Sequence, residues 1–471
     1  MQNLIKNKGQ VFTPSYLVDI ILDFCGYKGD FILQKHIIDN SCGDGAFITA
    51  IVHRYCKAFL SKSNNLEQLG EELQTYIHGI EIEDKAFHCC LKNLSNLISQ
   101  YGLDDIKFDI QHADALCTTQ YNQRMDFVVG NPPYVRVHNL AEKYEMVKRF
   151  SFAQGGMTDL YLVFYELGLK MLSNNGVLCY ITPSSWLNSL AATNMRNYIY
   201  QTKNIRGVVD LGHFQPFKTT SYTMIVLLDK VGQHEEVDYY TYNASKNSPS
   251  FVTSISIKDI CIQGCFYFST HEKLHLLQEI INSSCLQKAV VKNGYATLCD
   301  KVFIGPKKFR KFVIPVVKAS TAQKTEAFYP YDELGKPYPP EEIFRHKDVA
   351  DFLLENRERL LKRKSEQGDS LWYLYGRTQG ILDTYKKKYA VSSIIKDVKS
   401  IKIQCCPAGT GVYGGLYILT EVDEKLLVKV LLNEDFISYL QLLKAYKSGG
   451  YYTINSKQLE KYINYMINKY E

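Results

Sequence analysis

The feature that most constrains the fold is a regular alternation of short apolar runs with amphipathic stretches over the first 230 residues. Strand-like runs occur at residues 36–39, 76–82, 108–112, 126–129, 176–181, 205–211 and 223–228. Helix-like stretches occur between them at residues 16–24, 46–60, 84–98 and 160–172. Strands joined by such helices predict an α/β fold with a mostly parallel sheet and helices on both faces. A chain of 471 residues also predicts a second domain.

Polar residues stand at or just after the ends of four of the predicted strands. They are Asp39, Glu81, Asp114 and Asn131. In a mostly parallel sheet, ligands bind at the carboxyl ends of the strands. The coincidence of four such residues predicts a ligand site at this edge.

A glycine turn follows the first of these strands. Gly43 and Gly45 flank Asp44 just after Asp39, without the fuller glycine or Lys-Ser pattern of a phosphate-binding loop. Acids beside the glycines favour a cationic ligand, and a plain structural turn is the alternative. Glu81 can accept both hydroxyls of a ribose, although it lies further from the turn than in the dinucleotide fingerprint.

The most informative motif follows the fourth strand, at Asn131, Pro132, Pro133 and Tyr134. Two consecutive prolines stiffen the loop and remove two N–H donors. The Asn131 side-chain oxygen and the Pro132 carbonyl can then accept both hydrogens of one planar amine, while the Tyr134 ring stacks on its base. The alternative is a proline turn with a packed tyrosine.

These motifs occur in a familiar order. The series is residues 8–14 (Lys-Gly-Gln-Val-Phe-Thr-Pro), residues 39–47, Glu81, Asp114 and residues 131–134. The sequence resembles the gamma-class N6-adenine DNA methyltransferases of bacterial restriction–modification systems over about residues 8–230. Looser similarity at residues 372–380, 411–417 and 449–452 resembles the target-recognition domains of the Eco57I-like branch. The resemblance implies a Rossmann-like class I methyltransferase fold with a second, α+β target-recognition domain.

The resemblance implies S-adenosyl-L-methionine as cofactor and no metal. Glu81 would bind the ribose hydroxyls, Ile82 would pack on the cofactor adenine, and Asp114 would take its amine. One departure is Asn40, where the family often has proline. The residues implied in cofactor binding are Phe12, Thr13, Asp39, Ser41, Cys42, Gly43, Gly45, Glu81, Ile82, Asp114, Ala115, Asn131 and Pro133.

The implied reaction is methyl transfer to the N6 amine of an adenine in double-stranded DNA. The residues expected to contact the reacting base are Asn131, Pro132, Pro133, Tyr134 and a second aromatic residue from a later loop. Phe217 is the chosen candidate for that ring, and Phe214 is its close rival. Because the amine is inaccessible inside a duplex, the base must be flipped out.

Charge distinguishes the later part of the chain. Residues 295–471 carry 29 Lys and Arg against 21 Asp and Glu, whereas residues 1–294 carry 26 against 28. We therefore expect a catalytic S-adenosylmethionine-binding domain at 1–235, a connecting segment at 236–294 and a basic DNA target-recognition domain at 295–471. The expected DNA contacts are Trp372, Tyr373, Arg377, Gln379 and Tyr413, with packing inside the second domain as the alternative for Trp372 and Arg377.

Other functions share parts of this pattern. An N4-cytosine DNA methyltransferase uses the same chemistry, although Ser rather than Asn is its family tendency before Pro-Pro-Tyr. A protein-glutamine methyltransferase, an rRNA adenine methyltransferase and a catalytically idle DNA-binding specificity protein are the remaining alternatives. Thirteen scattered cysteines and the absence of a leader or apolar span predict a cytoplasmic bacterial protein with free thiols. We expect no fused nuclease, and a separately encoded restriction endonuclease is a candidate partner.

Overall fold

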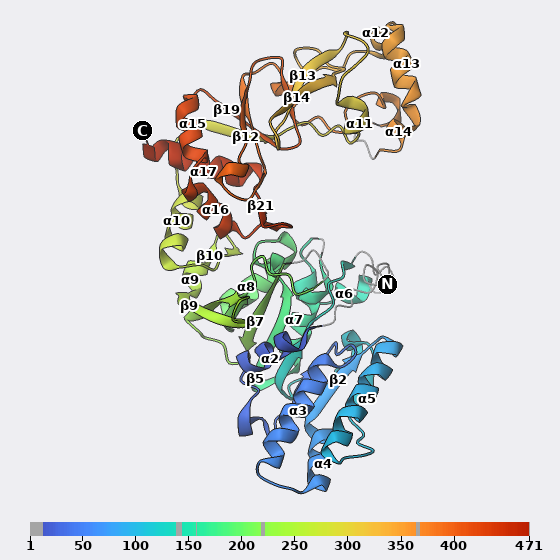
Figure 1. Cartoon of the computed structure of the whole chain (residues 1–471), viewed down its shortest axis with the longest axis vertical. Coiled ribbons are helices and arrows are strands. Elements are labelled where there is room, and N and C mark those ends of the chain that lie inside the picture. Colours follow the sequence, from blue (N-terminus) through green and yellow to red (C-terminus); the bar gives the residue numbers. More distant parts are fainter. Residues whose placement is uncertain (1–12, 138–143, 157, 218–221, 364–367, 471) are drawn as a thin grey trace. The chain divides into compact units, whose positions relative to one another are not determined.

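A computed structural model describes residues 13–137, 144–156, 158–217, 222–363 and 368–470. The chain divides into two compact units, Met1–His275 (unit 1) and Leu276–Glu471 (unit 2), and each is considered by itself. Figure 1 labels the helices and strands of both units.

Unit 1 is built on a sheet whose described strands run in the order β3-β2-β1-β4-β5-β7-β6-β8-β9. Strands β1 to β5 are parallel to one another, and β7 is antiparallel to its neighbours β5 and β6. Strand β8 is parallel to β6, and β9 is antiparallel to β8. The strands are β1 (Ile37–Asp39), β2 (Ile77–Glu81), β3 (Asp109–His112), β4 (Met125–Gly130), β5 (Leu172–Pro183), β6 (Ile205–Asp210), β7 (Thr223–Asp229), β8 (Glu236–Asn243) and β9 (Ser248–Ser256).

Helices cover both faces of this sheet. Helices α2, α3, α4 and α5 share one core with Phe127, Val129 and Cys179, which point to one face. Figure 1 shows α3 and α5 beside β2. Helix α7 packs on the other face, where its Gly168 lies against Leu178 and Tyr180. The helices are α2 (Ser15–Phe24), α3 (Ala46–Leu60), α4 (Leu66–Tyr76), α5 (Asp84–Ile98), α6 (Tyr144–Val147), α7 (Leu160–Met171), α8 (Thr193–Thr202) and α9 (Ile257–Ile260).

Three different caps begin the helices that follow the early strands. Gly45 starts α3 with φ 90°, and a Cβ there would lie 2.7 Å from the Cys90 sulphur, so only glycine fits. Asn65 caps α4 by accepting from the Gln68 N–H, and Glu83 caps α5 by accepting from the Ala86 N–H. Gly45 and Glu83 fix where the chain passes from the sheet edge into α3 and α5, and Asn65 begins α4 after α3 has ended.

The predicted α/β fold with a mostly parallel sheet and helices on both faces is confirmed. The expected connecting segment 236–294 differs from the structure at both of its ends. Strands β8 and β9 extend the sheet of unit 1, because β8 supplies the hydrogen-bonding partners of the edge of β6. The division between the units falls within α10 (His271–Asn282), and β12 (Ala289–Asn293) already pairs inside unit 2.

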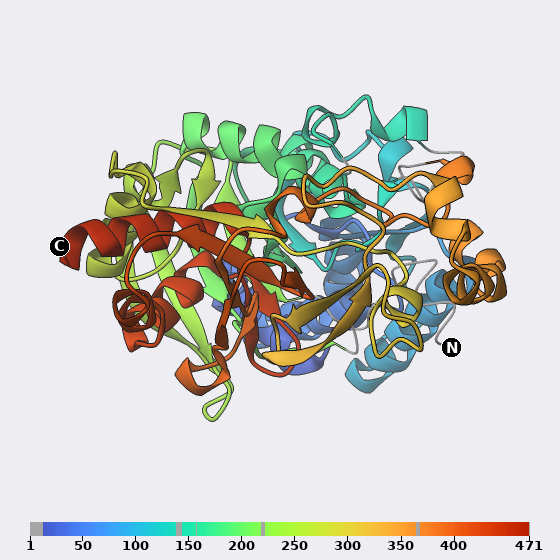
Figure 2. The ribbon, with the colours of Figure 1, turned by 90° about the horizontal axis from the view of Figure 1, so that it is seen from above.

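Unit 2 contains three small sheets in its described part. Their strand orders are β12-β19-β15-β17, β14-β13-β18 and β16-β21-β20. Helix α17 packs against β12 (Figures 1 and 2). The strands are β13 (Val313–Lys318), β14 (Gln323–Phe328), β15 (Lys388–Val391), β16 (Ile394–Ile395), β17 (Ile403–Cys406), β18 (Gly411–Tyr413), β19 (Leu416–Thr420), β20 (Tyr446–Lys447) and β21 (Tyr451–Thr453).

The helices of unit 2 complete an α+β arrangement. Helices α13 and α14 are separate, because the backbone leaves the helical region between them at Asn356 (φ −103°, ψ 3°). The helices are α11 (Asp300–Phe303), α12 (Pro340–Phe344), α13 (Lys347–Glu355), α14 (Arg357–Leu361), α15 (Glu424–Leu431), α16 (Glu434–Leu443) and α17 (Ser456–Tyr470).

All thirteen cysteines are free thiols. None of the described helices combines the length and the apolar character that a membrane crossing requires.

Candidate active site

The strand register brings the predicted motif residues to one edge of the sheet. Asp39, the last residue of β1, pairs with Val129 of β4 and Gly79 of β2. Glu81, the last residue of β2, pairs with His112 of β3. Because these strands are parallel neighbours, the residues that follow each of them emerge side by side.

The ends of β1 and β4 are in direct contact. Gly130 ends β4 with φ 149°, and a Cβ at this position would lie 2.7 Å from Oδ1 of Asp39. Glycine is therefore required where the chain turns from β4 into residues 131–134. The contact joins the glycine-turn motif to the Asn-Pro-Pro-Tyr motif.

Glu81 holds the glycine turn in place. One of its carboxylate oxygens accepts from the Gly43 N–H at 2.8 Å, and the other accepts from the Glu83 N–H at 2.7 Å. A carboxylate has about four acceptor positions, so capacity remains for ligand hydroxyls. Gly43 has φ 56° and open space where a side chain would stand.

Asp39 is a buried acid near that turn. It accepts from the Ser41 N–H at 3.0 Å. Burial, and secondarily repulsion from Glu81, raises the pKa of Asp39 to about 7. The Ser41 hydroxyl is buried nearby and has no hydrogen-bond partner among the described residues. An unpaired hydroxyl beside a carboxylate whose charge is disfavoured suits a cationic ligand with polar groups.

The remaining residues expected at the cofactor differ in what they expose. The Ile82 side chain is 54% exposed, and Asp114 accepts from the Leu116 N–H at the start of η3 (Ala115–Cys117), whose Ala115 is buried. The Cys42 side chain is buried in the same core as Cys90, so only its main chain belongs to the turn. The predicted contact at Phe12 lies outside the described residues.

Asn131 is oriented by Thr13, a partnership that sequence reasoning missed. Its side-chain N–H donates to the Thr13 hydroxyl at 3.1 Å, and the Thr13 side chain is buried. The following Pro132 is buried and Pro133 is half-buried. We expected Thr13 to contact only the cofactor. From its position just before α2, it also fixes the direction of the Asn131 side-chain amide.

Tyr134 is anchored beside the second aromatic candidate. Its hydroxyl donates to the Ile181 carbonyl at 3.1 Å, and its ring lies edge-on to Tyr161 and Phe217, with 6.4 Å between centroids in both pairs. Phe214 instead packs on Tyr242 at 4.7 Å. Of the two rival phenylalanines, Phe217 is the one that contacts Tyr134.

Asn40, the departure from the family pattern, is buried beneath the site. It accepts from the Tyr180 hydroxyl at 2.9 Å, and its side-chain nitrogen lies 3.8 Å from the Met171 sulphur. No periodicity or motif signalled this role, because both partners come from β5 and its preceding helix. Among the described residues, no three His, Cys, Asp or Glu side chains are grouped to hold a metal ion.

The predicted DNA contacts in unit 2 separate into buried and exposed residues. Tyr373 and Tyr413 belong to a core cluster, and the Tyr373 hydroxyl donates to the Tyr338 carbonyl. Buried rings cannot stack on DNA, so these two expectations are wrong. Trp372 is half-buried, with the Arg357 guanidinium 5.8 Å above its ring.

Arg377 and Gln379 are exposed. The Arg377 N–H donates to the Ala296 carbonyl, and the Gln379 side chain donates to the Gly294 carbonyl at 2.7 Å. Both therefore lie on a surface segment tied to residues 294–296.

Comparison with known proteins matches part of the chain to a family. Residues 48–217 match the family model described as Eco57I restriction-modification methylase. This segment of the chain is similar to that family. The predicted resemblance to this family is thereby confirmed.

Two curated relatives are similar to this chain over different lengths. Type II methyltransferase M.BstVI of Geobacillus stearothermophilus is 30% identical over 242 residues, covering 48% of this chain and 43% of the relative. Type II restriction enzyme and methyltransferase RM.Eco57I of Escherichia coli is 22% identical over 493 residues, covering 79% of this chain and 47% of the relative. The chain spans less than half of the length of each.

One solved structure resembles this chain over nearly its whole length. The Type IIL restriction-modification enzyme MmeI, solved in complex with DNA, gives a TM-score of 0.64 at 13% identity. The match covers 94% of this chain and 63% of MmeI. This chain therefore shares the fold of MmeI, and the likeness extends over both of its units.

Proposed function

We propose that this chain is a site-specific DNA methyltransferase that transfers a methyl group from S-adenosyl-L-methionine to the N6 amine of a flipped-out adenine. The observation that carries the proposal is the Asn131 amide, directed by Thr13 at the edge where Asp39 and Gly130 touch. This arrangement supports an acceptor for an amine next to a pocket for a cationic ligand.

The residues at the glycine turn fit the proposed cofactor. Asp39 and the Ser41 hydroxyl would hold its amino group, since an acid with a raised pKa gains most from a cationic partner. Glu81 would accept from the ribose hydroxyls, and the exposed Ile82 would pack on the adenine. When bound, the cofactor supplies a methyl group activated by a sulfonium.

Asn131 and Pro132 would bind the target amine. The adenine amine is a poor nucleophile because its lone pair is delocalised into the ring. Two oxygen acceptors, the Asn131 side chain and the Pro132 carbonyl, would favour a pyramidal nitrogen and stabilise the positive charge that develops on it. Thr13 acts as a positioning residue, because its bond to the amide nitrogen keeps the amide oxygen turned toward the amine.

Tyr134 and Phe217 would hold the extruded base. The bond from the Tyr134 hydroxyl to the Ile181 carbonyl fixes its ring. The Phe217 ring is inclined at 74° to it, so stacking by both rings requires Phe217 to turn. Stacking would offset part of the few kcal/mol that base extrusion costs.

Unit 2 is proposed as the target-recognition domain, with residues 295–471 as its basic part. Its excess of Lys and Arg supports phosphate binding, and MmeI, which is similar in fold, was solved with DNA. Arg377 and Gln379 are the contacts from our sequence analysis whose exposure suits base edges. A separately encoded restriction endonuclease is the proposed partner system, since M.BstVI is named as a methyltransferase alone.

The test is transfer of tritium from methyl-labelled S-adenosylmethionine to duplex DNA, with RNA and protein as parallel acceptors. We expect label in DNA for the wild-type chain and background for Asn131→Ala. The exposed Asn96→Ala change is the matched control and should retain transfer. Label in RNA or protein instead of DNA would refute the proposal.

A further inference from the structure

Two leucines on separate segments of unit 2 form one exposed apolar knuckle. Leu382 and Leu334 are 72% and 71% exposed. Gly335 lies against Leu382, because a Cβ on this glycine would be 3.0 Å from the Leu382 Cδ2 atom. Single exposed leucines are common on protein surfaces, whereas exposed apolar side chains that lie together indicate an interaction site.

The turn that carries Leu334 is firmly built. Asp332 accepts from the Leu334 and Lys336 N–H groups at 2.9 and 2.8 Å, and the Asp332 N–H donates to the Lys336 carbonyl. Leu334 therefore projects from an ordered turn.

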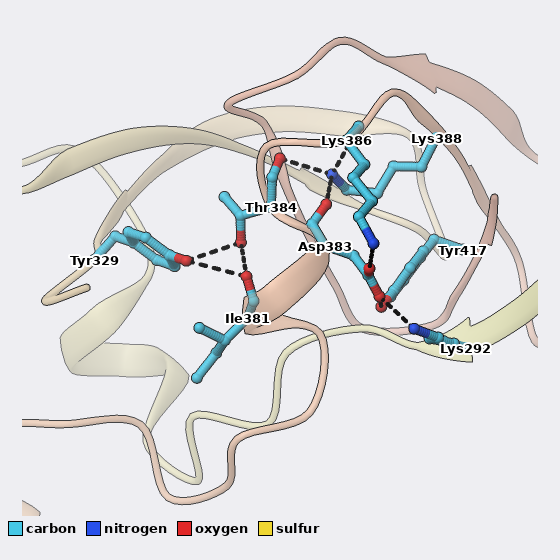
Figure 3. Close-up of polar contacts among 8 residues, drawn as sticks. All are labelled: Lys292, Tyr329, Ile381, Asp383, Thr384, Lys386, Lys388 and Tyr417. Atoms are coloured by element: carbon cyan, nitrogen blue, oxygen red, sulfur yellow. Dashed lines mark hydrogen bonds and ion pairs between the residues drawn. The ribbon is translucent and has the colours of Figure 1, made fainter. Parts of the chain in front are cut away.

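The loop that carries Leu382, residues 377–387, is anchored by its own buried residue Asp383. This acid is 2% exposed and accepts from Lys292, Lys386 and the Tyr417 hydroxyl at 2.7 to 2.8 Å (Figure 3). Hydrogen bonds from the two lysines and the tyrosine hold the pKa of Asp383 at about 2 against the opposing effect of its burial. Asp383, the residue that follows the exposed Leu382, is thus fixed by three side-chain hydrogen bonds.

A buried lysine holds the main chain of the same loop. Lys388 donates to the carbonyls of Asp383, Thr384 and Lys386 at 2.6 to 2.9 Å (Figure 3). The Thr384 hydroxyl in turn accepts from Tyr329 at 3.0 Å. Burying an ammonium group is unfavourable unless it is fully hydrogen-bonded, and Lys388 makes three such bonds to this loop. The main chain of the loop is therefore held rigidly.

Lysines lie on or beside the two segments that carry these leucines. Lys292, Lys336, Lys386 and Lys387 are all exposed, and Lys292 and Lys386 are paired with Asp383. Acids lie among them, with Asp332 and Glu333 on the turn of Leu334 and Glu421 near Lys387. Exposed leucines with lysines beside them fit a partner that offers both anionic groups and apolar surfaces.

Resting on the proposed function, we propose that Leu382 and Leu334 are DNA contacts, with the 377–387 loop presenting Leu382 to the base and sugar surfaces of a groove. Duplex DNA matches both halves of the surface, because lysines meet its phosphates and leucines pack on base edges or between base steps. The loop also begins with Arg377 and Gln379, so polar and apolar groups for reading DNA lie on one rigid segment.

The test uses the full chain with Leu382→Ser, and binding is measured by anisotropy on duplexes with and without the site mapped from modified DNA. We expect about tenfold weaker binding to the site-containing duplex, and an unchanged slope of log affinity against log salt. Lys387→Gln should instead lower that slope by about one. Leu286→Ser, at a 73% exposed leucine elsewhere in the unit, is the matched control and should bind like wild type.

Folding and alternative partners are checked with the same variants. Leu382→Met should restore binding, and the unfolding temperature of Leu382→Ser should equal that of wild type because the side chain is exposed. If the wild-type chain methylates DNA and Leu382→Ser binds DNA like wild type, this inference is wrong and the proposed function is unaffected. A changed oligomeric state without a changed DNA affinity also overturns it, in favour of a second copy as partner. Absence of methyl transfer by wild type refutes the proposed function itself.

Discussion

The two units differ in how their functional residues are fixed. In unit 1, the site residues follow the ends of neighbouring parallel strands, so the register of β1, β2 and β4 brings Asp39, Glu81 and Asn131 to one edge. In unit 2, the exposed candidates lie on a loop held by side chains that are distant in sequence, such as Lys292 and Tyr417. The position of the site residues in unit 1 follows from the order of its strands. The conformation of the 377–387 loop in unit 2 depends instead on tertiary contacts.

The largest expected effect comes from separating the units. A fragment of residues 1–275 should bind S-adenosylmethionine and lose site-specific DNA binding by about 10³-fold or more. A fragment ending at residue 235 should aggregate, because it lacks β8 and β9 and exposes the edge of β6. Calorimetry with the cofactor, gel filtration and DNA anisotropy measure these outcomes. Specific DNA binding by the 1–275 fragment would contradict the proposed division of labour.

Within unit 1, the next largest effect is expected at the amine acceptor. Asn131→Ala should lower methyl transfer about 10²–10³-fold, because an acceptor for developing charge is lost. Thr13→Val should give a smaller loss, as the amide is then no longer directed. Single-turnover transfer with saturating DNA measures both. Equal rates for Asn131→Ala and wild type would remove the central role of this residue.

A change at the ribose position should affect the cofactor without affecting DNA. Glu81→Ala should weaken S-adenosylmethionine binding about 10–100-fold, because it loses the proposed hydroxyl contacts and frees the Gly43 N–H. Titration calorimetry measures the affinity, with the exposed Glu71→Ala as control. Unaltered cofactor affinity would place the ribose elsewhere.

The last prediction concerns the pH dependence of the stability of unit 1 at Asp39. The pKa of Asp39 in the folded chain, about 7, lies above the value near 3.9 in the unfolded chain. The contribution of Asp39 to the free energy of unfolding is therefore fully present below about pH 4 and is lost as the pH rises to about 7. Asp39→Asn removes this loss, of up to about 4 kcal/mol, in the cofactor-free protein. Thermal unfolding between pH 4 and 8 should therefore favour the variant increasingly with pH. The exposed Asp104→Asn control should follow wild type.

Sequence patterns predicted much of unit 1 and little of unit 2. Elements such as α3 and β7 were predicted because apolar periodicity is local, and the motif residues were predicted because they follow those elements. The bond between Thr13 and Asn131 joins residues 118 positions apart and has no local signal. Tyr373 and Tyr413 were misjudged because an aromatic-rich stretch looks alike whether its rings pack in a core or face solvent.

The most direct test of the central claim is the identity of the modified base. DNA from cells that express the chain, and from cells that express Asn131→Ala, is digested to nucleosides and analysed by mass spectrometry. The Asn131 site predicts N6-methyldeoxyadenosine in the first sample and none above background in the second. N4-methyldeoxycytidine, or no methylated nucleoside in the wild-type sample, would contradict it.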